Sequence, residues 1–183
     1  GAVYLDGRVY RGFHDGVVRA FDVKSGQKVW ETYIGQKDMA AGMTSAPIAW
    51  NGMIFIGTAG GDVRDVRGRV LALDAATGQV IWQISTVPRM PTDTLHGPAG
   101  KMPEQEMLAT WGNPPGIPIS GGGTWTSYTL DPDTGYLYIP VGNSAPDYVK
   151  DLRPGSNLFA NHVLVVEAKT GNYVKNYEIM EDD

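Results

Sequence analysis

Short runs of hydrophobic residues, separated by turn-forming residues, dominate the chain and predict β-strands. Residues 70–74 and 163–167 are apolar at most positions, which is typical of strands buried on both faces in a stack of sheets. Each run ends at an acidic residue, and a Thr-Gly pair follows three residues later. Such polar residues favour turns, and Gly supplies the positive φ that a tight turn needs. Each run is therefore predicted to be one arm of a β-hairpin.

An eleven-residue pattern, Ala-x-Asp-x-x-(Ser/Thr)-Gly-x-x-x-Trp, covers these hairpins. It occurs at residues 20–30 and 72–82, which are 52 residues apart. A weaker third copy spans residues 165–175, where Glu167 replaces the Asp and Lys175 replaces the Trp. Self-similarity at such a period is the signature of a repeat architecture.

A second hairpin precedes each copy of the pattern. Asp6-Gly7 and Asn51-Gly52 lie between apolar runs and are strong type I′ turn signals. In the third unit a turn at residues 131–135 separates expected strands at residues 125–130 and 136–141. Four antiparallel strands repeated around an axis form a β-propeller blade, so the chain is predicted to be all-β. The expected blades comprise residues 2–34, 45–85 and 124–179.

The turns inside these hairpins are tight, whereas most links between hairpins are long. The long links are residues 35–43, 57–68, 86–123 and 142–161. In an up-and-down blade these links share one face, which is where sites built on loops are expected. The insertion at 86–123 is long enough to form part of a lid or a substrate mouth. Propellers have four to eight blades, so we expect this chain to be an internal piece of a larger propeller.

Composition excludes several classes of function. The net charge of −5 and the absence of a Lys/Arg cluster argue against a nucleic-acid partner. No run of about 18 apolar residues occurs, so no transmembrane segment is expected in this chain. The chain has no cysteine, and its three histidines show no metal-ligand spacing.

Candidate chemistry is concentrated in the long links. Three glycines at residues 121–123 precede Trp125 and would let a flat molecule approach the backbone, although an isolated Trp more often packs between blades. Asn143 offers an amide oxygen to a cation, and a turn role is the commoner alternative. Asp62 or Asp65 offers a carboxylate, whereas Arg64 or Arg67 could pair with either acid in a solvated salt bridge.

Taken together, these motifs resemble the pyrroloquinoline-quinone (PQQ) alcohol dehydrogenases. The resemblance covers essentially the whole chain in one continuous order. Its motifs are the hairpin repeats, residues 44–47, 60–62, 66–68, 121–125 and 141–143. Members of that family are eight-bladed periplasmic quinoproteins. The resemblance therefore implies about three blades of a probable eight, and a periplasmic location.

The resemblance also assigns roles to individual residues. Trp125 matches the Trp on which the PQQ ring system stacks. Asn143 matches a ligand of the Ca²⁺ or lanthanide ion beside PQQ. The acidic metal ligand matches Asp62, but the loop is one residue longer than in methanol dehydrogenases, which leaves Asp65 as the alternative.

Further cofactor contacts are implied by the same resemblance. Thr44 matches a Thr that bonds a PQQ carboxylate or carbonyl. Ala59, Gly60 and Gly61 match the segment beside the cofactor. Ala59 stands where the family has a Ser, so that contact is absent or is replaced by backbone or by Thr58.

The activity implied is oxidation of an alcohol, or of a sugar or aldehyde hydrate, by hydride transfer to the quinone, with electrons passed to a cytochrome c. The family's catalytic Asp is expected just after Asp183, so we assign no catalytic residue in this chain and expect it to be inactive alone. The alternative is a non-catalytic propeller with the same repeat, acting as a periplasmic binding or assembly scaffold. The combination of Trp125, Asn143 and Asp62 on the long links favours the enzyme.

Overall fold

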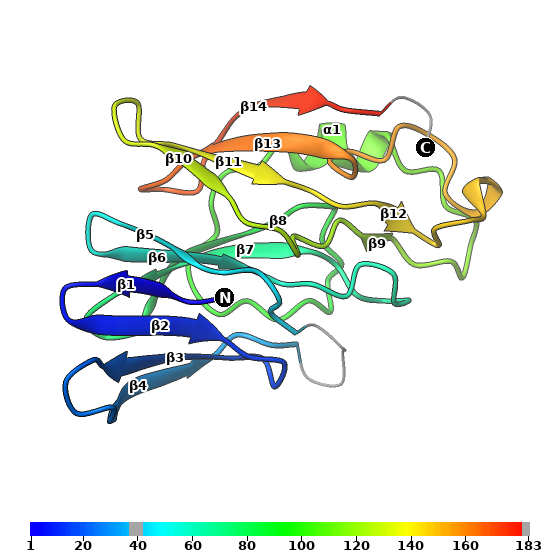
Figure 1. The fold of residues 1–183 in the computed structure, drawn as a ribbon. Coiled ribbons are helices and arrows are strands. Elements are labelled where there is room, and N and C mark those ends of the chain that lie inside the picture. The colour runs from blue at the N-terminus through cyan, green and yellow to red at the C-terminus, as the bar shows by residue number, and fades with distance from the viewer. Residues whose placement is uncertain (37–41, 181–183) are drawn as a thin grey trace.

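The strands form stacked four-stranded sheets, as Figure 1 shows for the computed structural model, which describes residues 1–36 and 42–180. The first sheet contains β1 (Val3–Leu5), β2 (Arg8–Gly12), β3 (Val17–Asp22) and β4 (Lys28–Tyr33). The second contains β5 (Ile48–Trp50), β6 (Met53–Gly57), β7 (Arg69–Asp74) and β8 (Val80–Ser85). The third contains β10 (Thr129–Asp131), β11 (Tyr136–Pro140), β13 (His162–Glu167) and β14 (Tyr173–Glu178).

Each sheet is antiparallel, and its strands pair in chain order, with the third sheet bypassing the short strand β12 (Ser144–Ala145). The predicted fold class, a propeller of four-stranded blades, is confirmed by this architecture. We call the sheets blades 1, 2 and 3. One strand was predicted too long, because β10 begins at Thr129 rather than at residue 125. Gly121 and Gly122 have φ of 107° and 67°, so the backbone that approaches Trp125 is not extended.

The tight turns have the predicted geometry. Asp6 and Gly7 have φ of 49° and 80°, and Asn51 and Gly52 have φ of 50° and 75°. Positive φ at both central residues is the type I′ conformation, whose twist matches that of the flanking strands. These turns lie at one end of the stacked sheets, and β9 (Ser120–Gly121) and β12 lie at the other (Figure 1).

The acidic residue of the repeat organises the second hairpin of each blade. Asp74 Oδ1 accepts hydrogen bonds from Thr77 N at 2.7 Å, Thr77 Oγ1 at 2.8 Å and Ala76 N at 3.0 Å. These bonds hold the pKa of Asp74 below its usual value, and the bond from the Thr77 hydroxyl makes the largest contribution. Asp22 receives the equivalent bonds in blade 1 from Ser25 and Lys24.

The Trp of the repeat joins each blade to the next. Trp30 Nε1 donates to Ala75 O at 3.0 Å, and Trp82 Nε1 donates to Ala168 O at 2.9 Å. Both acceptors follow the acidic residue of the next blade's turn. A Cβ on Gly171 would lie 2.7 Å from the Trp82 ring, so Gly allows the ring to lie against that turn. Trp30 and Trp82 therefore pack between neighbouring blades.

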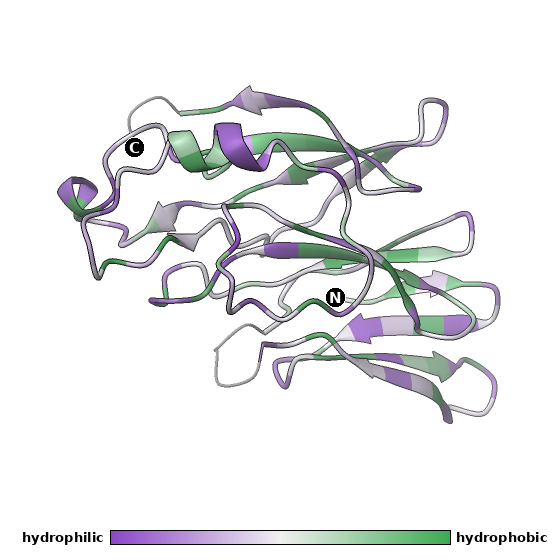
Figure 2. Ribbon diagram, turned by 180° about the vertical axis from the view of Figure 1, so that it is seen from behind, coloured by the Kyte–Doolittle hydropathy of each residue, from purple (hydrophilic) through white to green (hydrophobic). Residues whose placement is uncertain are grey.

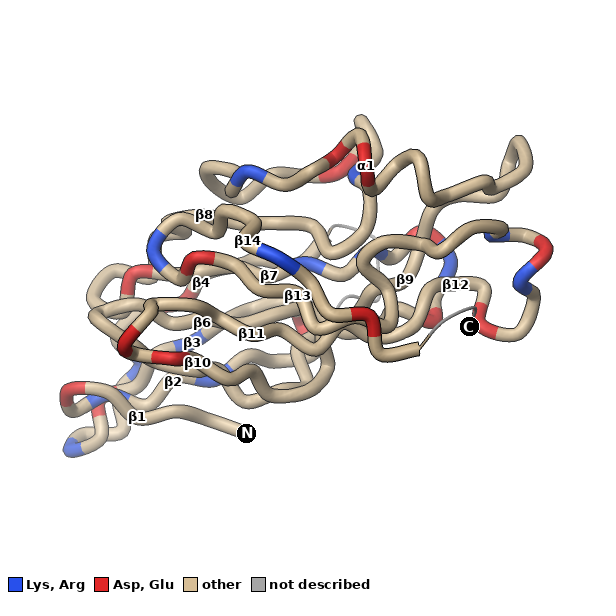
Figure 3. Tube along the Cα trace, turned by 90° about the horizontal axis from the view of Figure 1, so that it is seen from above, with Lys and Arg blue, Asp and Glu red and all other residues tan. Residues whose placement is uncertain are grey.

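Hydrophobic side chains fill the two interfaces between blades. Blades 2 and 3 bury a cluster that includes Phe55, Val70, Trp82, Leu137 and Leu164. Val18, Ile34, Ile56, Leu71 and Leu73 form a second cluster between blades 1 and 2. Figure 2 shows hydrophobic residues concentrated in the strands, and Figure 3 shows acidic and basic residues interspersed rather than gathered by sign.

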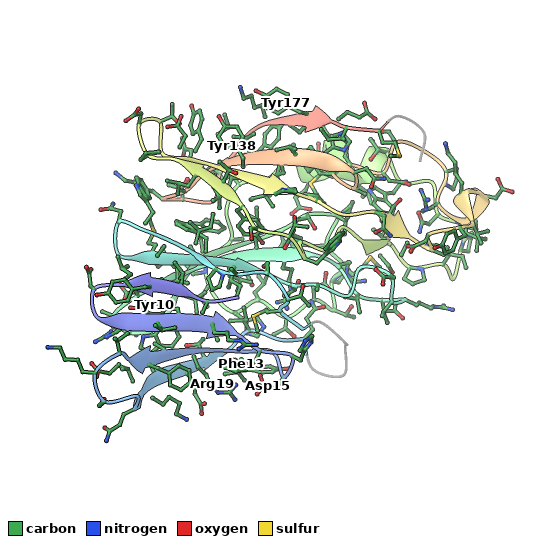
Figure 4. The ribbon with its side chains drawn as sticks, viewed as in Figure 1. Tyr10, Phe13, Asp15, Arg19, Tyr138 and Tyr177 are labelled. Atoms are coloured by element: carbon green, nitrogen blue, oxygen red, sulfur yellow. The ribbon has the colours of Figure 1, made fainter. Side chains whose placement is uncertain are left out.

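The outer face of blade 1 carries charged and aromatic side chains. Arg19 forms two ion pairs: its Nη2 lies 2.7 Å from Asp15 Oδ2, and its Nε lies 3.2 Å from Glu31 Oε2. The guanidinium carbons of Arg11 and Arg19 lie 5.2 Å and 4.7 Å from the centroid of the Phe13 ring. Figure 4 shows Phe13, Asp15 and Arg19 side by side on this blade. This face therefore carries its own charge network.

The insertion at residues 86–123 braces the blades. Residues 98–100 bond to the edge of β8, through Gln83 N to Pro98 O at 2.8 Å and Gly100 N to Gln83 O at 3.0 Å. Lys101 O then accepts from Tyr173 N in blade 3 at 2.9 Å. Helix α1 (Glu104–Ala109) follows and buries Met107. The insertion also contacts the long links, because Trp111 Nε1 donates to Leu158 O at 2.9 Å and Gly112 N donates to Pro154 O at 2.8 Å. Within the described ranges no helix is long and apolar enough to cross a membrane.

The contact from Trp82 to the next blade can be tested by removing its ring N–H. In the full-length, cofactor-free protein, Trp82→Phe leaves Ala168 O buried without its donor, which costs about 1–3 kcal/mol. Urea denaturation should show the free energy of unfolding reduced by that amount. Trp125→Phe is the matched control, because Trp125 is 56% exposed, and its effect should stay within about 0.5 kcal/mol. Equal losses in the two variants would contradict the role given to Trp82.

Candidate functional site

Four long links meet at the end of the sheets opposite the tight turns. A two-stranded sheet of β9 (Ser120–Gly121) and β12 (Ser144–Ala145) marks this end (Figure 1). Thr124 N donates to Thr58 O at 2.9 Å, and Gly142 N donates to Gly123 O at 2.9 Å. The segments around Gly60, Gly122 and Gly142 are thereby joined backbone to backbone.

Glycine is required where these links touch. A Cβ on Gly61 would lie 2.8 Å from Gly123 N, and one on Gly121 would lie 2.7 Å from Asn143 O. A Cβ on Gly142 would lie 2.9 Å from Trp125 Nε1. Each contact is closer than a real Cβ tolerates, so the absence of side chains lets the three links converge. The glycine-rich segment thus has a packing role as well as the predicted role of admitting a ligand.

Trp125 does not pack between blades. Its side chain is 56% exposed, whereas Trp82 is 2% exposed. The indole edge lies against Gly142, and Thr44 Oγ1 donates to Trp125 O at 3.3 Å. The structure thus brings Thr44 and Trp125 together beside the Gly142-Asn143 turn and leaves aromatic surface accessible.

Asn143 presents one oxygen without a donor. Its Nδ2 donates to Ser144 O at 3.2 Å and, in a short hydrogen bond, to Asp147 Oδ1. Both amide protons are thereby engaged, and Oδ1 accepts no hydrogen bond from the described residues. An amide oxygen held in this way is a suitable ligand for a hard cation.

Asp147 is a residue whose role the sequence did not reveal. It is the acceptor that fixes the Asn143 amide. The signal in the sequence was that Asp147 follows Asn143 by four residues in the same link. Arg153, 1% exposed, holds this link by donating to Pro146 O at 2.9 Å and Asp147 O at 3.0 Å.

The two candidate acids have different surroundings. Asp62 is exposed, makes no ion pair with any described residue, and borders a cavity of about 200 Å³ with Ile117, Pro118 and Ala145. Asp65 has φ of 68°, and its carboxylate lies 3.9 Å from Arg64 Nε. Asp62 is therefore the carboxylate that remains available for a ligand. Of the two predicted partners of Arg64, Asp65 is the one with which it forms an ion pair.

The other predicted cofactor contacts are partly engaged. Ala59 is buried and donates its N–H to Gly42 O at 2.8 Å. Thr58 Oγ1 is buried and accepts from Arg69 N at 3.0 Å, so it supplies no free hydroxyl in place of the Ser that Ala59 lacks. Gly60 has φ of 93°, which suits the bend before Gly61. Within residues 1–36 and 42–180, no three His, Asp or Glu side chains form a metal-binding group.

Arg67 pairs with neither Asp62 nor Asp65. It is 2% exposed and donates through Nε to Asp93 Oδ1 and Oδ2, at 3.0 Å and 2.9 Å, while Nη1 donates to Ile119 O at 3.0 Å. Asp93 belongs to the insertion, so this buried ion pair ties the insertion to the link that carries Asp62. The sequence offered Asp62 and Asp65 as partners because they are nearby in the chain, but the folded chain brings Asp93 closer.

Comparison with known proteins identifies the family. Residues 31–183 match the glucose/ethanol/alcohol dehydrogenase β-propeller domain family that is designated PQQ. The chain belongs to this family. It is 37% identical to quinohemoprotein alcohol dehydrogenase ADH-IIG of Pseudomonas putida over its whole length. It is 33% identical, over 97% of its length, to the dehydrogenase subunit of a quinone alcohol dehydrogenase of Acetobacter aceti.

Solved structures agree with this PQQ-family assignment. Quinohemoprotein alcohol dehydrogenase of Comamonas testosteroni superposes over the whole chain with a TM-score of 0.85 at 30% identity. The ADHIIG structure from Pseudomonas putida gives 0.84 at 33% identity. A europium-containing methanol dehydrogenase, at 22% identity and a TM-score of 0.82, shares the fold. The chain spans 25% of the length of the Pseudomonas putida and Acetobacter aceti relatives described above.

Breaking the buried ion pair tests its role in holding the insertion. Arg67→Met leaves the Asp93 carboxylate buried without its partner, and such a loss typically costs about 3–5 kcal/mol. Denaturant titration of the full-length protein should show this loss, together with faster proteolysis between residues 90 and 100. Arg64→Met is the matched control, because its side chain is 70% exposed and its removal should cost less than about 0.5 kcal/mol. Indistinguishable stabilities would contradict the anchoring role.

Proposed function

We propose that the full-length protein containing this chain oxidises alcohols with bound PQQ and a metal ion, and that this chain contributes the floor of the cofactor site and two metal ligands. Membership of the PQQ propeller family supports the reaction class. The observation that carries the proposal for this chain is the exposed Trp125 indole beside the Asn143 amide, whose Oδ1 accepts no hydrogen bond from the described residues.

The residues at this end suit a flat cofactor. Trp125 offers a large aromatic surface, and glycines at 121–123 and at 142 keep side chains away from its edge. The Thr44 hydroxyl lies beside the Trp125 backbone, to whose carbonyl it donates at 3.3 Å, and it would add a polar group next to the cofactor. When bound, PQQ would supply the two-electron oxidation, which none of these side chains can perform.

A hard cation beside the cofactor would be held by the oxygens of Asp62 and Asn143. Carboxylate and amide oxygens are ordinary ligands of Ca²⁺, and both cation types under consideration, Ca²⁺ and a lanthanide, prefer oxygen. Asp147 would act as a positioning residue, because its carboxylate engages the Asn143 amide nitrogen and turns Oδ1 outward. Two protein ligands leave further positions to other parts of the protein or to the cofactor.

The remaining components lie outside the described part of this chain. We place the catalytic base just after Asp183; residues 181–183 themselves are not among those described. We expect electrons to pass to a cytochrome c, in keeping with the name quinohemoprotein borne by several relatives. A periplasmic location is part of the same proposal.

Metal ligation can be tested in the full-length protein by PQQ-dependent dye reduction with a primary alcohol. Asp62→Ala and Asn143→Ala each remove an oxygen ligand, so the Ca²⁺ or light-lanthanide concentration for half-maximal activity should rise at least about tenfold. Asp65→Ala is the matched control and should leave the metal requirement unchanged. A shift in Asp65→Ala alone would transfer the ligand role to Asp65, and no PQQ-dependent alcohol oxidation by the unaltered protein would overturn the proposed function.

The isolated chain should not turn over alcohol even with PQQ and Ca²⁺. It lacks the proposed base, and general base catalysis typically contributes about 10²–10⁴ in rate. The assay compares residues 1–183 with the full-length protein at equal concentration. Comparable turnover would place the base inside this chain, where Asp65, Asp147 and Asp151 are the acids to examine.

A further inference from the structure

A second, smaller cavity lies away from the Trp125 site, between blade 2 and the insertion. It has a volume of about 10 Å³, room for one water-sized body, and Arg69 and Gln83 border it from β7 and β8. The insertion closes it with residues that include Asp93, Thr94 and Gly100. The cavity is therefore bordered by two parts of the chain that are joined by the Arg67–Asp93 ion pair.

Arg69 is buried with most of its guanidinium unpaired. The side chain is 3% exposed, and Nη2 donates to Ile34 O at 2.7 Å. Nε and Nη1 are buried without a hydrogen-bond partner. Burial lowers the pKa of Arg69 to about 10, so the group still carries its charge at neutral pH. A buried charge normally requires a compensating partner.

The surrounding groups leave a surplus positive charge. Asp93 is the acid whose charge acts on the pKa of Arg69, but Arg67 occupies both of its oxygens, and Met90 N donates to Oδ2 at 2.9 Å. A second ion pair borders the cavity, with Arg89 Nε 3.1 Å from Glu104 Oε1. This pair is partly exposed, and its two charges cancel, so it does not compensate Arg69.

The nearby His96 does not offset this charge. Burial, followed by the charge of Arg69, lowers the pKa of His96, so its ring is neutral at pH 7 and adds no charge. Among the described residues, no acid is paired with Arg69 itself.

Gln83 provides a second unpartnered group at the same cavity. It is 2% exposed, and both Nε2 and Oε1 are buried without a hydrogen-bond partner. An anion in the cavity would accept from Gln83 Nε2 and from Arg69 Nε and Nη1. Water could satisfy the amide, but it would leave the surplus charge uncompensated.

We propose that this cavity binds a small monovalent anion, such as chloride, between the Arg69 guanidinium and the Gln83 amide. The anion compensates the charge of Arg69 that Asp93, already paired with Arg67, does not compensate. The site is structural and independent of the Trp125 site. Its ligand class follows from the small volume of the cavity and from the donors that border it.

Chloride dependence of stability tests the site in the full-length, cofactor-free protein. Chloride titrated against gluconate at constant ionic strength should raise the melting temperature by about 1–3 °C and then saturate. Arg69→Met removes the buried charge, so its melting temperature should not respond to chloride. Arg64→Met, which removes an exposed arginine, should respond as the unaltered protein does. A response retained in Arg69→Met, or no response in the unaltered protein, overturns the proposal.

A second measurement does not depend on the variants folding. Crystals of the full-length protein grown with bromide in place of chloride should show an anomalous peak within hydrogen-bonding distance of Arg69 and Gln83. Density for water without anomalous signal at this position would show that the cavity is only hydrated and would overturn the proposal.

Discussion

The contact between the repeat Trp of one blade and the turn of the next determines how the rest of the chain is arranged. Trp82 fills the space over Gly171 and donates to Ala168 O, and Trp30 repeats the arrangement on Gly78 and Ala75. The contact combines burial of a large ring with a hydrogen bond of defined direction, so it fixes both spacing and register between sheets. Neighbouring blades can therefore place their links to within hydrogen-bonding distance of one another.

The site at the far end depends on that register. Thr58 and Thr124 come from links of different blades, yet their backbones are bonded at 2.9 Å. Glycines at the crossing points allow this approach, and the exposed Trp125 and the oriented Asn143 are positioned by it. The same blade-to-blade order is reinforced from outside by the insertion, through Asp93, Lys101 and Met107. Rigid sheets thus carry a site built almost wholly from irregular segments.

Much of this was predictable because short-range patterns control it. Asp6-Gly7 and the repeat acids specify their own turns, and alternation of apolar and turn residues specifies the strands. The family resemblance then pointed to Trp125 and Asn143. Sequence could not predict the partner of Arg67, because Asp93 is 26 residues away and reaches it only after the insertion folds. Nor could it predict that Trp125 lies outside a regular strand, or that Asp147 fixes the Asn143 amide, since both depend on where the links cross.

The central claim is that Trp125, Asn143 and Asp62 form one side of a cofactor and metal site. A crystal structure of the full-length protein with PQQ and a light lanthanide, located by its anomalous scattering, tests it most directly. The account predicts the quinone on the exposed face of Trp125 and the metal at about 2.3–2.6 Å from Asn143 Oδ1 and an Asp62 oxygen. A metal bound elsewhere, or a Trp125 face covered by protein rather than by the quinone, would contradict it.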